Sequence, residues 1–302
     1  MQNRCVCVID NYNYAKYLAP CLDSALAQTR AFDLIIVVDD GSVDDSRPII
    51  ERYARDHGNL IAVYKPNGGQ LSCFNAARDQ VENGDLVFFL DADDLYPANY
   101  VEEFVKAAAI ERADFYFCNA VKFTEPQDCP ADARVSDDPA VVLPLTSALT
   151  LASQRWVGSP TSALVVSGNL YRNILPYPFE RDWVVRADDV LVFGSAILGA
   201  RKVFIRSLGV GYRIHGSNLF DGEKKWSSKE ELLLREFRLE RLFTIYSGRA
   251  GVARHPPYAA VAREMQLLDQ GVKRLLGLPS TFKMLRRDTK SRIRQFFRVL
   301  FS

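Results

Sequence analysis

The sequence predicts an α/β fold: a doubly wound, mixed and mainly parallel sheet, followed by a helical C-terminal extension. Two observations support this prediction. Apolar runs of about five residues alternate with amphipathic stretches through the first 90 or so residues, which is the pattern of strands and helices in a wound sheet. Each run is apolar at consecutive positions, as expected of parallel strands that are buried on both faces.

The four runs are predicted to be the first strands of the sheet, at residues 5–9, 34–38, 60–64 and 86–90. Between them, apolar residues recur at intervals of three and four, which predicts helices at about residues 14–28, 42–57 and 70–81. The runs lead into polar residues, namely Asp10, Asp39, Asn67 and Asp91. Because the carboxyl ends of parallel strands share one edge, where open α/β sheets bind ligands, these side chains should converge.

The most informative stretch is residues 86–96, LVFFLDADDLY, in which five apolar residues lead into Asp91, Asp93 and Asp94. Three acids so close together repel one another unless a proton or a cation compensates. A hard divalent ion that carries a diphosphate fits this pattern. The alternative is ordinary turn chemistry, in which Asp94 starts the next helix.

The later chain is less regular. We expect a helix at residues 98–112, a strand at 115–118, a surface loop at 125–140, a helix at 182–198 and strands at 203–205 and 209–214.

Charge divides the chain into two parts. Residues 1–220 contain 20 Lys and Arg against 28 Asp and Glu, whereas residues 221–302 contain 18 against 9. We therefore expect a catalytic domain at 1–220 and a helical, basic extension at 221–302. Residues 281–302 carry seven Lys and Arg on an amphipathic pattern, which fits an anionic membrane surface. A packed C-terminal helix or an oligomer contact are the alternatives, and the sequence leaves the oligomeric state open.

The six cysteines include no CxxC pair, and only three histidines accompany them, so a zinc site is not expected. Reduced thiols in apolar segments indicate a cytoplasmic protein. We see no signal-peptide pattern and no apolar run of the roughly 18 residues that would span a bilayer. The expectation is a soluble protein, or one peripheral on the cytoplasmic face of the membrane, with no nucleic-acid partner.

Four ordered motifs resemble the N-terminal half of the family 2 glycosyltransferases of the GT-A fold: CVCVIDNYNYAKYLAPCLDSALAQT, IIVVDDGSVDDS, NGGQ and LVFFLDADDLYPANYVEEF. The resemblance is dense over residues 4–118 and thinner to about 218. It implies metal-dependent, inverting transfer of a sugar from a nucleoside diphosphate sugar, with a UDP-sugar favoured, to a carbohydrate or lipid-linked acceptor. The metal would be Mn²⁺ or Mg²⁺, and the pathway surface polysaccharide or glycoconjugate synthesis.

The resemblance also implies roles for single residues. Tyr12 and Asp39 would line the pocket for the nucleotide base, Asn67 would sit beside the base or ribose, and Gln70 would belong to the same donor site. Asp91 and Asp93 match the DxD motif, whose acids approach the ribose and the metal-bound diphosphate.

In the later part of the chain, Asp189 stands where the family has its usual general base, with Asp188 as the second candidate. His215 resembles a residue that approaches the metal. A solvated helix face for the two acids, and a plain strand-end histidine, are the alternatives.

Three departures from the family pattern are visible. Asp10 stands where a proline is common, Phe74 where an arginine often precedes the asparagine, and Asp188 where a glutamate is usual. Two other functions would share such a sheet: a nucleotidyltransferase that makes the activated sugar, and an inactive nucleotide-sugar-binding scaffold. A nucleotidyltransferase would normally begin with a glycine-rich loop and a basic residue, and residues 10–18, DNYNYAKYL, do not have one.

Overall fold

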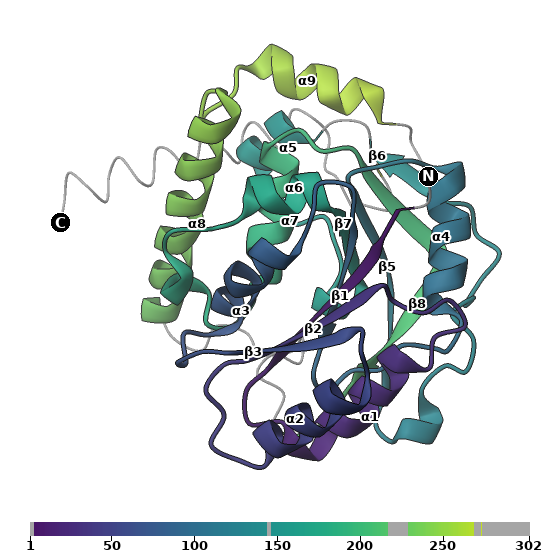
Figure 1. Cartoon of the computed structure of the whole chain (residues 1–302). Coiled ribbons are helices and arrows are strands. Elements are labelled where there is room, and N and C mark those ends of the chain that lie inside the picture. The colour runs from purple at the N-terminus through teal and green to yellow at the C-terminus, as the bar shows by residue number, and fades with distance from the viewer. Residues whose placement is uncertain (1–2, 144–145, 217–228, 269–272, 274–302) are drawn as a thin grey trace.

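The computed structural model describes residues 3–143, 146–216, 229–268 and 273. Its centre is an eight-stranded mixed sheet in the order β3-β2-β1-β4-β7-β5-β8-β6, with helices on both faces (Figure 1). This confirms the predicted doubly wound fold. The strands are β1 Cys5–Asn11, β2 Leu34–Asp39, β3 Leu60–Tyr64, β4 Leu86–Asp91, β5 Phe115–Phe123, β6 Val141–Leu143, β7 Leu164–Ser167 and β8 Lys202–Arg213. The α-helices are α1 Ala15–Leu26, α2 Ser46–Asp56, α3 Gln70–Ala77, α4 Tyr100–Ile110, α5 Ser147–Ser153, α6 Gly168–Ile174, α7 Asp188–Ile197, α8 Lys229–Ala250 and α9 Tyr258–Leu267.

The first four strands are parallel, and their register decides where the polar ends lie. Asp10 of β1 is paired with Asp91 of β4, and Asn11 with Asp39 of β2. The acids at the ends of these strands therefore lie along one edge of the sheet, as the sequence predicted. Beyond β4 the sheet is mixed, because β7 runs antiparallel to both β4 and β5.

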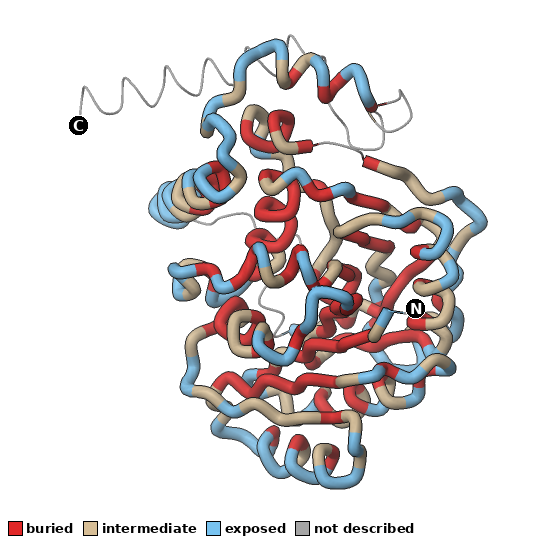
Figure 2. Tube along the Cα trace, turned by 45° about the horizontal axis from the view of Figure 1, so that its top comes forward, coloured by how far each residue is buried: buried red, intermediate tan, exposed pale blue. Residues whose placement is uncertain are grey.

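Two hydrophobic cores sandwich the sheet. Along β1, Val6 and Val8 face the core formed with α3 and α5 to α9, while Cys7 and Ile9 face the core formed with α1, α2 and α4. Figure 2 shows the buried strands running through the middle of the molecule, with exposed residues at the periphery. Consecutive apolar residues are needed here because both faces of the parallel strands are covered.

The structure corrects two predicted elements. Residues 182–198 are not one helix: a 3₁₀ turn, Glu180–Trp183, is followed by an irregular segment, and α7 begins only at Asp188. Arg186 has a left-handed backbone, with φ of 65°, which interrupts a right-handed helix. The two predicted late strands are one strand, β8, whose pairing with β5 shifts register between Phe117 and Asn119.

The helices α8 and α9 pack onto the same core as α7. Leu242, Phe243 and Tyr246 of α8 are fully buried, and the ring of Phe243 lies edge-on to Phe193 of α7 at 5.1 Å. The division of the chain at residue 220 stays a prediction. The basic segment 281–302 lies outside the described residues. Among the helices that the structure does describe, none combines the length and apolar character needed to cross a bilayer.

Candidate active site

A cavity of about 630 Å³ opens at the edge where β1, β2 and β4 end. Its wall is built from these strand ends, the loop before α3, the segment 156–161 and the segment 184–188, which ends at the first residue of α7. Six of the residues predicted from the sequence line it: Tyr12, Asn67, Gln70, Asp91, Asp93 and Asp188. The other three residues are neighbours of residues in that wall. Asp39 is hydrogen-bonded to Asn11, His215 contacts Asp93, and Asp189 follows Asp188 in the chain.

Asp10 and Asp91 form a carboxyl pair in the cavity wall. They are register partners in adjacent strands, and Gln70 Nε2 donates to Asp91 Oδ1 at 2.9 Å. Burial raises the pKa of Asp10 to about 7, and burial together with the charge of Asp10 raises the pKa of Asp91 well above its ordinary value. Oδ1 of Asp10 is buried without a hydrogen-bond partner. The pair therefore favours a shared proton or an incoming donor group.

Asp93 is held by His215. The two side chains meet at 2.9 Å between Nε2 and Oδ2, and the ring of Tyr17 stacks on the imidazole at 4.7 Å. Oxygen atoms of Asp91, Asp93 and Asp94 lie within 4.8 Å of one another. Carboxylates with an imidazole nearby are suitable ligands for Mn²⁺ or Mg²⁺.

Asp94 has a structural role within this group. It is fully buried and accepts hydrogen bonds from the backbone N–H of Arg213 at 2.7 Å and from Ser162 Oγ at 2.6 Å. It does not start the next helix, because α4 begins at Tyr100. Asp91 and Asp93 are thus the two acids of this motif that face the cavity.

The two acids at the start of α7 have different surroundings. Asp188 lines the cavity, and burial together with the neighbouring charge of Asp189 raises its pKa to about 7. Asp189 is fully buried, and its Oδ1 accepts a hydrogen bond from Arg186 Nη2 at 2.9 Å. Of the two carboxylates, that of Asp188 is the one placed to meet a ligand.

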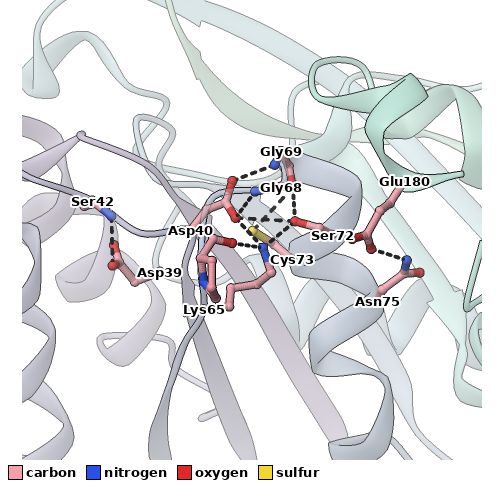
Figure 3. A network of polar contacts seen from close by, with 11 residues as sticks. Asp39, Asp40, Ser42, Lys65, Gly68, Gly69, Ser72, Cys73, Asn75 and Glu180 are labelled. Atoms are coloured by element: carbon pink, nitrogen blue, oxygen red, sulfur yellow. Dashed lines mark hydrogen bonds and ion pairs between the residues drawn. The ribbon is translucent and has the colours of Figure 1, made fainter.

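Asp39 does not line the cavity. Its Oδ1 accepts a hydrogen bond from Asn11 Nδ2 at 2.9 Å. Its Oδ2 accepts a hydrogen bond from the backbone N–H of Ser42 at 3.1 Å (Figure 3). Asn11, which does line the cavity, donates this hydrogen bond to Asp39. Asp39 therefore contacts a residue of the cavity wall and helps to orient its side chain.

Asp40 is a cavity residue that the sequence reasoning missed. Its carboxylate accepts hydrogen bonds from the N–H groups of Gly68, at 2.9 Å, and Gly69, at 2.7 Å, and forms an ion pair with Lys65 at 2.5 Å (Figure 3). These contacts fix the loop that presents Asn67. In the sequence, Asp40 is visible only as the second acid of the Asp39-Asp40 pair. The sequence alone does not show which of the two acids lines the cavity.

Gly69 and Gln70 connect this loop to the start of α7. Gly69 has φ of +87°, and a Cβ there would lie 2.3 Å from the Cα of Val184, so no larger residue fits without displacing that segment. Gln70 Oε1 accepts from the N–H of Ala187 at 3.1 Å while its amide nitrogen binds Asp91. One side chain thus links the DxD motif to the segment that carries Asp188.

Comparison with known proteins agrees with this architecture. The family model described as Glycosyl transferase family 2 matches residues 6–129. An uncharacterized glycosyltransferase of Nostoc sp. is 30% identical over 226 residues, which cover 74% of this chain and 69% of the relative. The chain belongs to glycosyl transferase family 2.

Other relatives of this glycosyltransferase match over shorter segments. Glycosyltransferase GlyA of Streptococcus pneumoniae is 31% identical over 118 residues, which are 39% of this chain and 17% of GlyA. This chain therefore spans only a small part of that relative.

Solved structures confirm the GT-A-like fold of the glycosyltransferase. TarS of S. aureus, residues 1–349 in complex with UDP, has a TM-score of 0.58 at 20% identity, covering 92% of this chain and 73% of that chain. The mannosyltransferase PcManGT from Pyrobaculum calidifontis, in complex with GDP-Man and Mn²⁺, has a TM-score of 0.53 at 19% identity, covering 96% and 74%.

Proposed function

We propose that this glycosyltransferase transfers a sugar, with inversion, from a nucleoside diphosphate sugar to a carbohydrate or lipid-linked acceptor, with Mn²⁺ or Mg²⁺ as cofactor, in surface polysaccharide or glycoconjugate synthesis. The observation that carries the proposal is that Asp91, Asp93 and Asp188 open on one cavity. The TarS complexes contain UDP or UDP-GlcNAc, and the PcManGT complex contains GDP-Man with Mn²⁺, which supports a nucleotide-sugar donor and a metal here.

Donor binding is the first task of the site. Tyr12 and Asn67 offer an aromatic ring and an amide for the nucleoside, and Gln70 holds Asp91 in place for the ribose. A divalent ion held by Asp93, with His215 beside it, would neutralise charge on the departing diphosphate. The contact from His215 orients Asp93 before any ligand arrives.

Proton removal is the second task. Inverting displacement needs a carboxylate that takes the proton of the acceptor hydroxyl on the face opposite the leaving group. In our proposal the acid pair of α7 supplies it: Asp188 faces the cavity, and Asp189 holds Arg186 by their ion pair. A pKa near 7 suits a base that must be ionised in a substantial fraction of molecules at cellular pH and still accept a proton.

Donor and metal binding can be tested without knowing the acceptor. The assay is a thermal-shift screen of UDP, GDP and their sugar conjugates, in which a ligand that binds the folded state raises the melting temperature by mass action. We expect a larger rise with Mn²⁺ than without it, because the metal would hold the diphosphate. Asp93→Asn should remove the Mn²⁺-dependent part of the nucleotide affinity in calorimetry. Asp137→Asn, a fully exposed acid, is the charge-matched control. Metal-dependent affinity that survives in Asp93→Asn would contradict the metal assignment.

A further inference from the structure

Exposed apolar side chains gather on one part of the surface, which we call the apolar rim. It consists of Phe179, Val184, Val185, Leu232 to Leu234 and Phe237, each of them between 36% and 58% exposed. The residues come from two segments, one just before α7 and one in the first half of α8. Figure 1 shows α8 on the outside of the molecule, and Figure 2 shows that its outer side is exposed.

Contacts hold the two segments of the apolar rim together. The guanidinium of Arg241 lies over the ring of Phe179 at 4.3 Å and over the ring of Phe237 at 4.5 Å, and it forms an ion pair with Asp182 at 3.4 Å. The two exposed rings therefore both contact one cation rather than being left free to fold onto the protein. This contact joins the two segments of the apolar rim at Phe179 and Phe237.

The apolar rim is continuous with the mouth of the cavity. Val184 and Val185 line the cavity, and Val184 rests on Gly69. Asp188 follows four residues after Val184 and lines the same cavity. An acceptor that approaches Asp188 along this segment therefore passes over the apolar side chains of Val184 and Val185.

The size and chemistry of the apolar rim indicate what covers it. A stable protein interface takes roughly 20–30 residues from each partner, and the apolar rim has seven. The surface of α8 carries Leu and Phe together with arginines, whose stems are apolar, and with Glu236 and Glu240. Exposed Leu and Phe with apolar arginine stems suit shallow insertion into the interface of a lipid layer. Such insertion does not require a protein partner.

We propose that the apolar rim rests on a lipid surface, so that the cavity opens toward an acceptor anchored in that surface. The inference rests on the proposed function and selects the lipid-linked acceptor over a water-soluble one. It assigns the contact to α8 and the segment before α7, by apolar insertion, and it does not depend on the basic residues 281–302.

The test is sedimentation of the full-length protein with vesicles of phosphatidylethanolamine and phosphatidylglycerol. Salt at about 0.5 M shortens the Debye length to a few ångströms, so electrostatic binding through a basic segment is suppressed while apolar insertion persists. We expect the wild type to bind the vesicles. The double variant Leu233→Ser with Leu234→Ser should bind them with an affinity lower by about tenfold or more. Ile110→Ser, at an 83% exposed position on α4 of the opposite face, is the matched control and should bind as the wild type does.

Each outcome decides the proposal. Wild-type protein that stays in solution at this salt concentration, or a double variant that binds as well as the control, overturns it. A wild-type dimer in analytical ultracentrifugation that the double variant dissociates would assign the apolar rim to a second copy and also overturn it. Nucleotide binding by thermal shift is measured on the same samples, so a failure of donor binding is seen separately from a failure of lipid binding, and equal melting temperatures show that the variants are folded.

Discussion

Asp188 and Asp189 are adjacent in sequence, yet their carboxylates meet different surroundings, and this difference sets the roles that we expect. Successive residues at a helix start point about 100° apart, so one acid reaches the cavity while the other is buried against Arg186. Asp188→Asn should lower turnover by about 10²–10⁴-fold with nucleotide affinity unchanged. Asp189→Asn should cost less, because it removes a positioning contact. Initial rates and nucleotide titrations for both variants decide the question, and the reverse order of effects would place the base at Asp189.

The same carboxyl predicts how stability depends on pH. Asp188 has a folded pKa of about 7 against an ordinary value of 3.8, so its contribution is fully present below about pH 4 and is lost as the pH rises through 7. Asn cannot ionise. Asp188→Asn should therefore raise the melting temperature more at pH 8 than at pH 5, as measured by scanning calorimetry. An equal gain at both pH values would show that burial does not disfavour this charge.

The sequence predicted which acids gather at the site but not which of them face the cavity. Asp91 and Asp93 were predictable because they follow an apolar strand whose register places them at the ligand-binding edge. The separate orientations of Asp39 and Asp40 depend on hydrogen bonds to Asn11 and to the loop before α3, which are contacts across the sheet. A linear pattern carries no information about such contacts.

At the scale of elements, the loop before α3 is held by one buried ion pair. The side chain of Asp40 is 3% exposed and that of Lys65 18%, and the same carboxylate also accepts two backbone N–H groups. Asp40→Asn should lower the free energy of unfolding by about 2–4 kcal/mol, because it leaves a half-buried ammonium without its charge partner and turns an amide N–H₂ group toward N–H donors.

The measurement for Asp40→Asn is urea unfolding, with nucleotide affinity recorded in parallel. The control is Glu102→Gln, which removes a surface ion pair to Lys106 and should change stability by less than about 1 kcal/mol. Equal effects of the two variants would mean that the buried pair does not hold the loop.

Helices and strands were predicted well where the spacing of apolar residues alone determines them. They were predicted poorly where the end of an element depends on the backbone conformation of a single residue. The strands of the parallel half follow from apolar runs that need both faces covered. The break before α7 depends on the left-handed conformation of Arg186, a residue type with no preference for it. The surrounding fold stabilises that conformation, and the sequence pattern does not reveal it. The predicted helix therefore ran through Arg186 without a break.

At the scale of the whole molecule, the helices after residue 228 complete a core that begins in the N-terminal half. Glu264 of α9 accepts hydrogen bonds from the N–H groups of Ala148 and Leu149 at 3.0 and 2.8 Å, so it satisfies the first turn of α5 from more than 100 residues away. The division of the chain at residue 220 stays a prediction, because it rests on the shift in charge at residue 221, and composition reports surface residues and not the apolar face that packs. Which face of α8 is covered is a property of the assembled fold.

This packing predicts that residues 1–220 do not fold stably alone. Tyr246 Oη donates to the carbonyl oxygen of Ile174, and Arg249 donates to the carbonyls of Ile174 and Pro176, in addition to the burial of Leu242 and Phe243. Removing large buried side chains costs about 2–5 kcal/mol each, and a typical domain has only about 5–15 kcal/mol in total. A chain ending at residue 220 should therefore lack a cooperative thermal transition, whereas one ending at residue 268 should keep it together with nucleotide binding. A shortened chain of 220 residues that melts cooperatively near the full-length temperature would instead support a catalytic domain that ends there.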